Sequence, residues 1–179
     1  MSVKLATLVV IFSFPLACLI AVGRISSRSW IRYPSAIFVN TMRSNPLILI
    51  VFWFFFLVPL IIGKPVGDVA SVMIGFIVFF AAYFTEIIRS GIQSVGRNQI
   101  LAGLSTGLTY FQTMRMIVLP QALRNMMPAL ITECVIVFQG TTIAYVVGLR
   151  EFLNSTFLIT EITLRPAELY TFAAIVYFV

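Results

Sequence analysis

Several polar side chains lie inside an apolar run, where a polar group needs a reason to be present. Residues 126–147 form a run long enough to approach a membrane span, yet they contain Glu133, Thr141 and Thr142. An ionisable group within a span usually faces the bundle interior or a wet cavity, so Glu133 is a candidate lining residue of a pathway. The two threonine hydroxyls are candidates to contact the amino or carboxylate group of a small solute.

A structural role is the alternative for the same residues. Glu133 is then protonated or paired with a neighbouring helix, and the two threonines bond back to their own helix. Glu86 and Arg89 are spaced three residues apart near the end of another apolar run. This spacing predicts a local ion pair that steadies the adjoining loop rather than a contact with a solute.

The residue sets that catalysis requires are missing from the sequence. The chain contains no histidine and only two cysteines, Cys18 and Cys134, both within apolar runs. There is no metal-ligand spacing, and no serine or cysteine has a plausible base, so an intramembrane enzyme is disfavoured. A disulfide framework is not expected from these two cysteines either.

The composition indicates an integral membrane protein. The 179 residues are 60% hydrophobic and only 10% charged, which is more apolar surface than a water-soluble core could bury. Apolar runs predict five membrane helices, at about residues 5–23, 46–62, 69–88, 126–147 and 169–179. The last run has about 11 residues against the roughly 17 that a span needs, so we expect a truncated chain whose fifth helix is incomplete.

The basic residues predict how these helices are oriented. Eight of the twelve lie in two connections, after the first run and after the third: Arg24, Arg28, Arg32, Arg43, Arg89, Arg97, Arg115 and Arg124. Cytoplasmic connections are enriched in Lys and Arg, so these two are predicted to be cytoplasmic and the N-terminus external. Because the net charge of +6 is spread over loops rather than gathered on one face, it does not indicate nucleic-acid binding.

Proline and acidic residues suggest where the helices begin. Asp68 is predicted to cap the third span, and Pro46 and Pro65 to bracket the second. Pro120 and Pro128 are expected at or in the first turns of the fourth, where proline is tolerated.

The connection at residues 89–125 contains a segment unlike the spans. An amphipathic helix is predicted from Gln99 to Pro120, with a stripe formed by Ile100, Leu104, Leu108 and Phe111. Ala102, Gly103 and Gly107 leave a shallow side that a partner protein could approach, and Gly107 can also end or bend the helix. The alternative is an interfacial helix lying on lipid headgroups.

These residues resemble a known family. The order Ala102-Gly103, Gly107, Ile117, Leu119-Pro120 is similar to the E-A-A loop of ABC importer permeases, which has E-A-A, then a glycine, then I-x-L-P. Further similarity lies in Arg43-Ser-Asn-Pro46-Leu47, in the run from Ala82 to Val95, and in Leu119-Pro120-Gln-Ala-Leu-Arg124. Together these motifs resemble the polar amino-acid branch, and within it the permeases of glutamate/aspartate importers.

The resemblance implies an all-α, five-helix type I ABC importer permease fold, incomplete at the ends, in a bacterial cytoplasmic (inner) membrane. It further implies a second permease subunit, the same or homologous, two cytoplasmic ATPases and an external substrate-binding protein. The chain lacks the G-x-x-x-x-G-K-[ST] phosphate loop, so ATP is expected to be used by a partner subunit. The predicted ATPase-coupling residues are Leu101, Ala102, Gly103, Gly107, Leu119 and Pro120.

Two positions depart from the family pattern. Leu101 replaces the glutamate of E-A-A, and Gly140-Thr141-Thr142 replaces D-T-S. Glu133 lies seven residues before Gly140, about two helical turns away, and is predicted to lie on the same face and partly replace the missing acid. The resemblance favours acidic amino acids as substrates, although an ionised Glu133 would repel a free carboxylate. A small carrier or channel that works without ATP remains the alternative function.

Overall fold

The fold is described from a computed structural model covering residues 1–64 and 67–178, which are helical and contain no β-strand in these ranges. In chain order the helices are α1 (Ser2–Ile25), α2 (Ser29–Ser44), α3 (Leu47–Phe52), the π-helical turn η1 (Trp53–Leu57), α4 (Val58–Ile62), α5 (Asp68–Gln93), α6 (Arg97–Ser105), α7 (Tyr110–Thr113), the π-helical turn η2 (Met114–Val118), α8 (Leu119–Gly140), the 3-10 helix η3 (Thr141–Val147), α9 (Phe152–Thr163) and α10 (Pro166–Tyr177).

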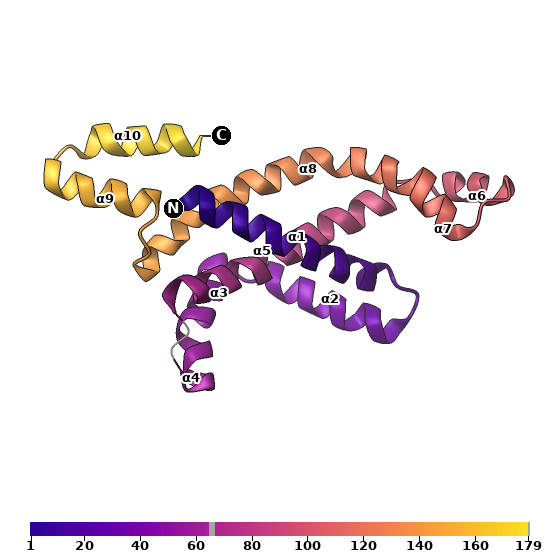
Figure 1. Ribbon diagram of the computed structural model, residues 1–179, viewed down its shortest axis with the longest axis horizontal. Coiled ribbons are helices and arrows are strands. Elements are labelled where there is room, and N and C mark those ends of the chain that lie inside the picture. The colour runs from indigo at the N-terminus through magenta and orange to yellow at the C-terminus, as the bar shows by residue number, and fades with distance from the viewer. Residues whose placement is uncertain (65–66, 179) are drawn as a thin grey trace.

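Helix α5 forms the centre of the molecule and packs against α1, α2 and α8 (Figure 1). Its phenylalanines Phe76, Phe80 and Phe84 are buried, while the small residues Ala17 and Ala21 of α1 are also buried and let the helices approach closely. The Thr85 hydroxyl lies 2.6 Å from the Ala81 carbonyl oxygen and 3.3 Å from that of Ala17. Its polar group is therefore satisfied inside the α1–α5 contact.

Within residues 1–64 and 67–178, three helical stretches are long and apolar enough to cross a membrane: α1, α5 and the continuous stretch Tyr110–Val147. A fourth exists if α2 and the stretch Leu47–Ile62 count as one span bent by 107°. The predicted runs 5–23 and 69–88 lie within α1 and α5, and 126–147 lies within the third stretch. Their limits relative to a bilayer remain predictions.

Each π-helical turn lies directly before a proline. Turn η1 ends at Leu57, two residues before Pro59, and η2 ends at Val118, two residues before Pro120. Proline has no N–H to donate to the preceding turn, so the backbone hydrogen bonds there span five residues instead of four while the helix continues. Leu119-Pro120 therefore lies within a continuous helix, and the prediction that it ends the insert's helix is wrong.

Several local predictions are corrected. Residues 29–44 and 152–163, which were expected to be connections, form α2 and α9. Gly67 is the N-cap of α5, and Asp68 is the first helical residue, making no side-chain capping bond. Pro65, predicted to bracket the second span, and Val179, the end of the predicted fifth, lie outside the described residues.

The connections separate to the two ends of the molecule. Figure 1 shows the α1–α2 connection and the α6–α7 insert at one end, and the N-terminus with α9 at the other. Arg28 belongs to the first connection, and Arg97 and Arg115 to the insert. The two arginine-containing connections that predicted a cytoplasmic side thus lie at the same end, while Arg43 lies in the last turn of α2.

Candidate functional site

Glu133 is buried at the wall of a hollow between α2, α5 and α8. Its side chain is carried by α8, only 6% of the residue is exposed, and its Oε1 has no hydrogen-bond partner within the described part of the chain. The hollow has a volume of about 440 Å³, and its wall includes Arg43, Tyr83, Glu86 and Thr132. We call it the charged hollow. A buried carboxylate oxygen without a hydrogen-bond partner costs free energy, so a ligand that donates a hydrogen bond to Oε1 would be stabilised here.

Arg43 comes to this hollow from the last turn of α2. Its guanidinium lies over the ring of Tyr83, 5.3 Å from the ring centre, in a cation–π contact. The sequence placed Arg43 in a cytoplasmic loop and gave it no role in the pathway. Apart from the count of loop arginines, the motif from Arg43 to Leu47 is the signal that marked this position.

Glu86 faces the same hollow but already has its partners. Arg89, three residues later, bonds to its Oε1, which confirms the predicted local ion pair. Arg24 of α1 adds a second bridge, with its Nη2 lying 3.0 Å from Oε2 of Glu86. Glu86 therefore joins α5 to α1, a structural role that the local spacing only half revealed.

A second hollow, of about 310 Å³, shares Tyr83 and Glu133 with the charged hollow. Gly140 also lines it, so the predicted common face of Glu133 and Gly140 is confirmed as geometry, while their role in a pathway remains a prediction. Most other lining residues are apolar: Leu47, Phe79, Phe80, Ile136 and Ile143. A Cβ at position 140 would lie 3.1 Å from Cζ of Phe80, so little space is left there for a side chain.

Thr141 and Thr142 use their hydroxyl protons within their own helix. Each hydroxyl donates to a carbonyl oxygen three residues earlier, that of Phe138 or Gln139, at 2.8 Å in both cases. This is the back-bonding that the structural alternative predicts. Thr141 is fully buried, whereas Thr142 is half-buried.

The insert is a helical hairpin rather than one helix. Helix α6 ends at Ser105, and Gly107 has φ +85°, a left-handed conformation that only glycine adopts readily. Thr109 then starts α7 with a capping box, in which its hydroxyl accepts from the Gln112 N–H and the Gln112 side chain accepts from the Thr109 N–H. The prediction of a continuous amphipathic helix from Gln99 to Pro120 is therefore wrong.

The chain reversal buries one of the predicted docking residues. A Cβ on Gly103 would lie 2.7 Å from Cγ2 of Thr113 and 2.9 Å from Cδ1 of Ile117, so Gly103 lets α6 pack closely against the second arm of the hairpin. It does not contribute to an open docking side, contrary to the prediction. The exposed coupling candidates are Leu101, Ala102, Gly107, Leu119 and Pro120.

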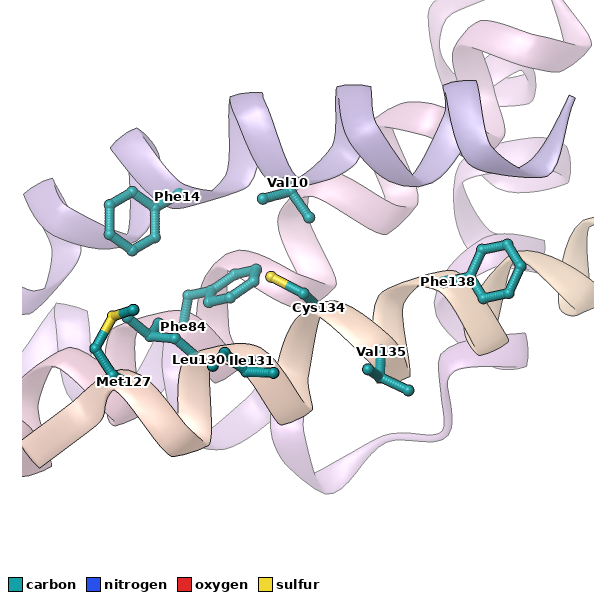
Figure 2. A pocket seen from close by; sticks show the side chains of 9 residues that line it. All are labelled: Val10, Phe14, Phe84, Met127, Leu130, Ile131, Cys134, Val135 and Phe138. Carbon is teal, nitrogen blue, oxygen red and sulfur yellow. The ribbon is translucent and has the colours of Figure 1, made fainter. Parts of the chain in front are cut away.

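The other face of α8 lines a different kind of hollow. Figure 2 shows nine carbon- and sulfur-tipped side chains from α1, α5 and α8 around it, among them Phe14, Phe84, Ile131 and Cys134. Its volume is about 550 Å³, and we call it the apolar groove. With no charged or hydrogen-bonding side chain other than a thiol, it can hold hydrocarbon but offers nothing to orient a polar solute.

Comparison with known proteins gives consistent matches over nearly the whole chain. Residues 13–179 match the family described as "Binding-protein-dependent transport system inner membrane component". The glutamate/aspartate import permease protein GltK of Escherichia coli is 37% identical, over 99% of this chain and 83% of the relative. The probable glutamine ABC transporter permease protein GlnP of Bacillus subtilis is 36% identical, over 80% of this chain and 66% of its own.

Solved structures show the same fold. A chain from the crystal structure of an amino acid ABC transporter with histidines superimposes with a TM-score of 0.91, at 28% identity, covering 99% of this chain and 83% of that one. A chain of the inward-facing MetNI methionine ABC transporter has a TM-score of 0.74 at 18% identity, covering 99% of this chain and 85% of its own, and supports the fold alone.

Proposed function

Because the chain belongs to the family of binding-protein-dependent transport system inner membrane components, we propose that it is the permease subunit of an ATP-driven amino-acid importer. Its all-helical architecture is that of type I ABC importer permeases. The observation that carries the proposal within this chain is the charged hollow, in which the buried Glu133 lacks a partner. A membrane protein keeps an ionisable group at such a place when a polar solute or ion passes it.

The partners follow from the family. The assembly would contain a second permease subunit, the same or homologous, two cytoplasmic ATPases that use the ATP, and an external binding protein that delivers the amino acid. The sequence lacks a phosphate loop of its own, which supports this division of work. The surrounding solvent is the lipid of a bacterial inner membrane.

The hairpin insert offers a route for coupling. Helix α5 leads into α6 after only a short turn, and the second arm of the hairpin continues without interruption into α8. A push on the exposed side near Leu101 and Ala102 would move α5 and α8, two of the three helices that line the charged hollow. Closure of the ATPases could thereby switch the hollow between inward-open and outward-open arrangements.

The substrate path would run along the face of α8 that carries Glu133 and Gly140, with Thr141 and Thr142 at the following turn. GltK is named for glutamate and aspartate, and GlnP for glutamine. An amino acid is the substrate class that these relatives share.

Ala102 provides the clean test of ATPase docking. Gly107 is unsuitable, because its positive φ would strain any side chain whatever lies nearby. Ala102→Leu should leave the permease in the membrane but detach the ATPase or uncouple hydrolysis from uptake, because the added volume prevents close approach. Ala167→Leu, the same exchange at an exposed position of α10, far from the hairpin, is the matched control. Normal ATPase copurification and uptake in Ala102→Leu would contradict the coupling assignment, and uptake without any ATPase would favour a carrier or channel.

The orientation can be tested separately. With the native cysteines replaced, a cysteine at Ser94 should be shielded from a membrane-impermeant thiol reagent in intact cells, because it follows α5 at the arginine-rich end. A cysteine at Gly67, where no atom of the described residues other than its chain neighbours lies within 4 Å of the added Cβ, should react. The reverse pattern would place the N-terminus inside and the insert outside.

A further inference from the structure

The charged hollow contains one acid and one base that remain available. Glu133 has its Oε1 without a partner and is 6% exposed. Among the described residues, Arg43 makes no hydrogen bond or ion pair; it lies over the ring of Tyr83 and close enough to Glu133 for their charges to interact. The third charged residue at the wall, Glu86, is neutralised by Arg24 and Arg89. The hollow thus presents one positive and one negative group that lie near each other without a direct hydrogen bond or ion pair between them.

Those two groups match the two charges that every free amino acid carries on its backbone. A carboxylate suits the planar fork of an arginine guanidinium, and an ammonium group supplies the donors that Glu133 lacks. We infer that Arg43 binds the α-carboxylate and Glu133 the α-ammonium group of an amino acid whose side chain is uncharged. This inference rests on the proposed transport function.

The adjoining hollow sets the side-chain preference. It opens beside Glu133 and Tyr83, and none of its lining residues is a lysine or arginine. A glutamate or aspartate substrate would bring a second carboxylate next to Glu133 and place it against Leu47, Phe80 and Ile136, where no cationic side chain compensates its charge. A lysine or arginine substrate would need a second acid, which this hollow does not contain. An apolar or amide side chain meets neither cost.

Gly140 supports the same preference. The resemblance places an aspartate here, yet this chain has glycine, and Phe80 and Leu47 lie within 3.1 and 3.3 Å of where its Cβ would be. The end of the hollow away from the charged groups is therefore closed by hydrocarbon. A substrate oriented by Arg43 and Glu133 would direct its side chain toward these residues.

Binding should be measured on the permease–ATPase complex in lipid nanodiscs without the binding protein, so that selectivity of the permease alone is read. Radiolabelled leucine is the probe, competed by glutamate, lysine, leucine methyl ester, which lacks the carboxylate, and 4-methylpentanoate, which lacks the ammonium group. Leucine should bind at least about tenfold more tightly than any of these four, since hydrogen bonds to charged groups contribute about 1.5–3 kcal/mol.

The variants assign each group to its partner. In Glu133→Gln, leucine and 4-methylpentanoate, which lacks the ammonium group, should bind with nearly equal affinity. In Arg43→Gln, leucine and its methyl ester, which lacks the carboxylate, should bind with equal affinity. Each difference in affinity disappears because it depends on both members of a pair. The exposed residues Glu161 and Arg32 provide controls, and Glu161→Gln and Arg32→Gln should retain both differences. If Arg43→Gln fails to fold, the analogues still test the unmodified chain.

The possible failures are distinguishable. Glutamate or lysine binding as tightly as leucine would overturn the inferred substrate class, and affinity differences that persist in both variants would overturn the residue assignment. ATP-driven uptake of glutamate in reconstituted vesicles, unaffected by Glu133→Gln, would leave the proposed function standing while this inference fails. Absence of ATP-driven uptake for every amino acid would overturn both.

Discussion

The two faces of α8 differ in what they can do. One face lines the charged hollow with Glu133 and Thr132, and the other lines the apolar groove with Ile131 and Cys134, which directly flank those two residues in the sequence. A helix turns by about 100° per residue, so neighbours in sequence face different surroundings. The apolar groove of Figure 2 is the larger hollow, yet it contains nothing that would select or orient an amino acid.

The difference shows that volume is a poor guide to function in a membrane protein. An apolar groove within a membrane is filled by lipid or by another helix without special chemistry. A charge inside the membrane, in contrast, costs free energy unless water, a partner or a solute compensates it. The smaller hollow is thus the informative one, because retaining Glu133 and Arg43 there requires compensation.

Introducing a charge on each face should give the largest difference. Ile131→Asp places a carboxylate in the apolar groove and should lower the free energy of unfolding by about 3 kcal/mol, the cost of an acidic residue at the centre of a span. Thr132→Asp, one residue further, faces the charged hollow and should cost clearly less. Denaturant unfolding in detergent measures both, and equal losses would remove the distinction between the two faces.

A smaller effect on the free energy of unfolding is expected when a partner of Glu86, the carboxylate with a structural role, is removed. Arg24→Gln removes one of the two arginines on Glu86 and should lower the free energy of unfolding by about 1 kcal/mol, because Arg89 remains. Uptake at a temperature where the variant is folded should stay near normal. A severe loss of uptake by this folded variant would mean that Glu86, and not only Glu133, takes part in the pathway.

The smallest effect is expected from cysteine labelling, which tests which face of α8 is accessible to water. Native Cys134 faces the apolar groove and should react with a membrane-permeant maleimide but slowly with a charged thiol reagent, since a charged reagent enters an apolar groove poorly. Thr132→Cys, made without the native cysteines, should react with the charged reagent in purified, detergent-solubilised protein, with little change in stability. Faster charged-reagent labelling at Cys134 than at position 132 would contradict the assignment of the two faces.

The predictions that succeeded depend on short sequence distances. The Glu86–Arg89 pair spans three residues, and the common face of Glu133 and Gly140 spans seven on one helix. Helical periodicity fixes both relations without knowledge of the fold. The all-helical membrane architecture was predictable for a similar reason, since apolar runs and loop arginines are local signals.

The features that the sequence did not reveal depend on contacts between distant segments. Arg24 reaches Glu86 across 62 residues, and Arg43 reaches the hollow of Glu133 from another helix. Gly103 is buried because the chain reverses at Gly107, whose sign of φ is not readable from its identity. Helix α2 was missed because its arginines were counted as loop residues, and α9 because it lies between two predicted apolar runs.

The most direct test of the account is ATP-driven amino-acid uptake by reconstituted vesicles containing Glu133→Gln. The amide retains the size of the side chain but loses its charge, so folding and ATPase binding should persist while uptake falls by about tenfold or more. Cys134→Ala, changed at the neighbouring residue on the apolar face, is the matched control and should transport normally. Adding Gly140→Asp to Glu133→Gln should recover part of the uptake only if Phe80 gives way. Unchanged uptake in Glu133→Gln, with the complex assembled, would contradict the assignment of the charged hollow as the substrate path.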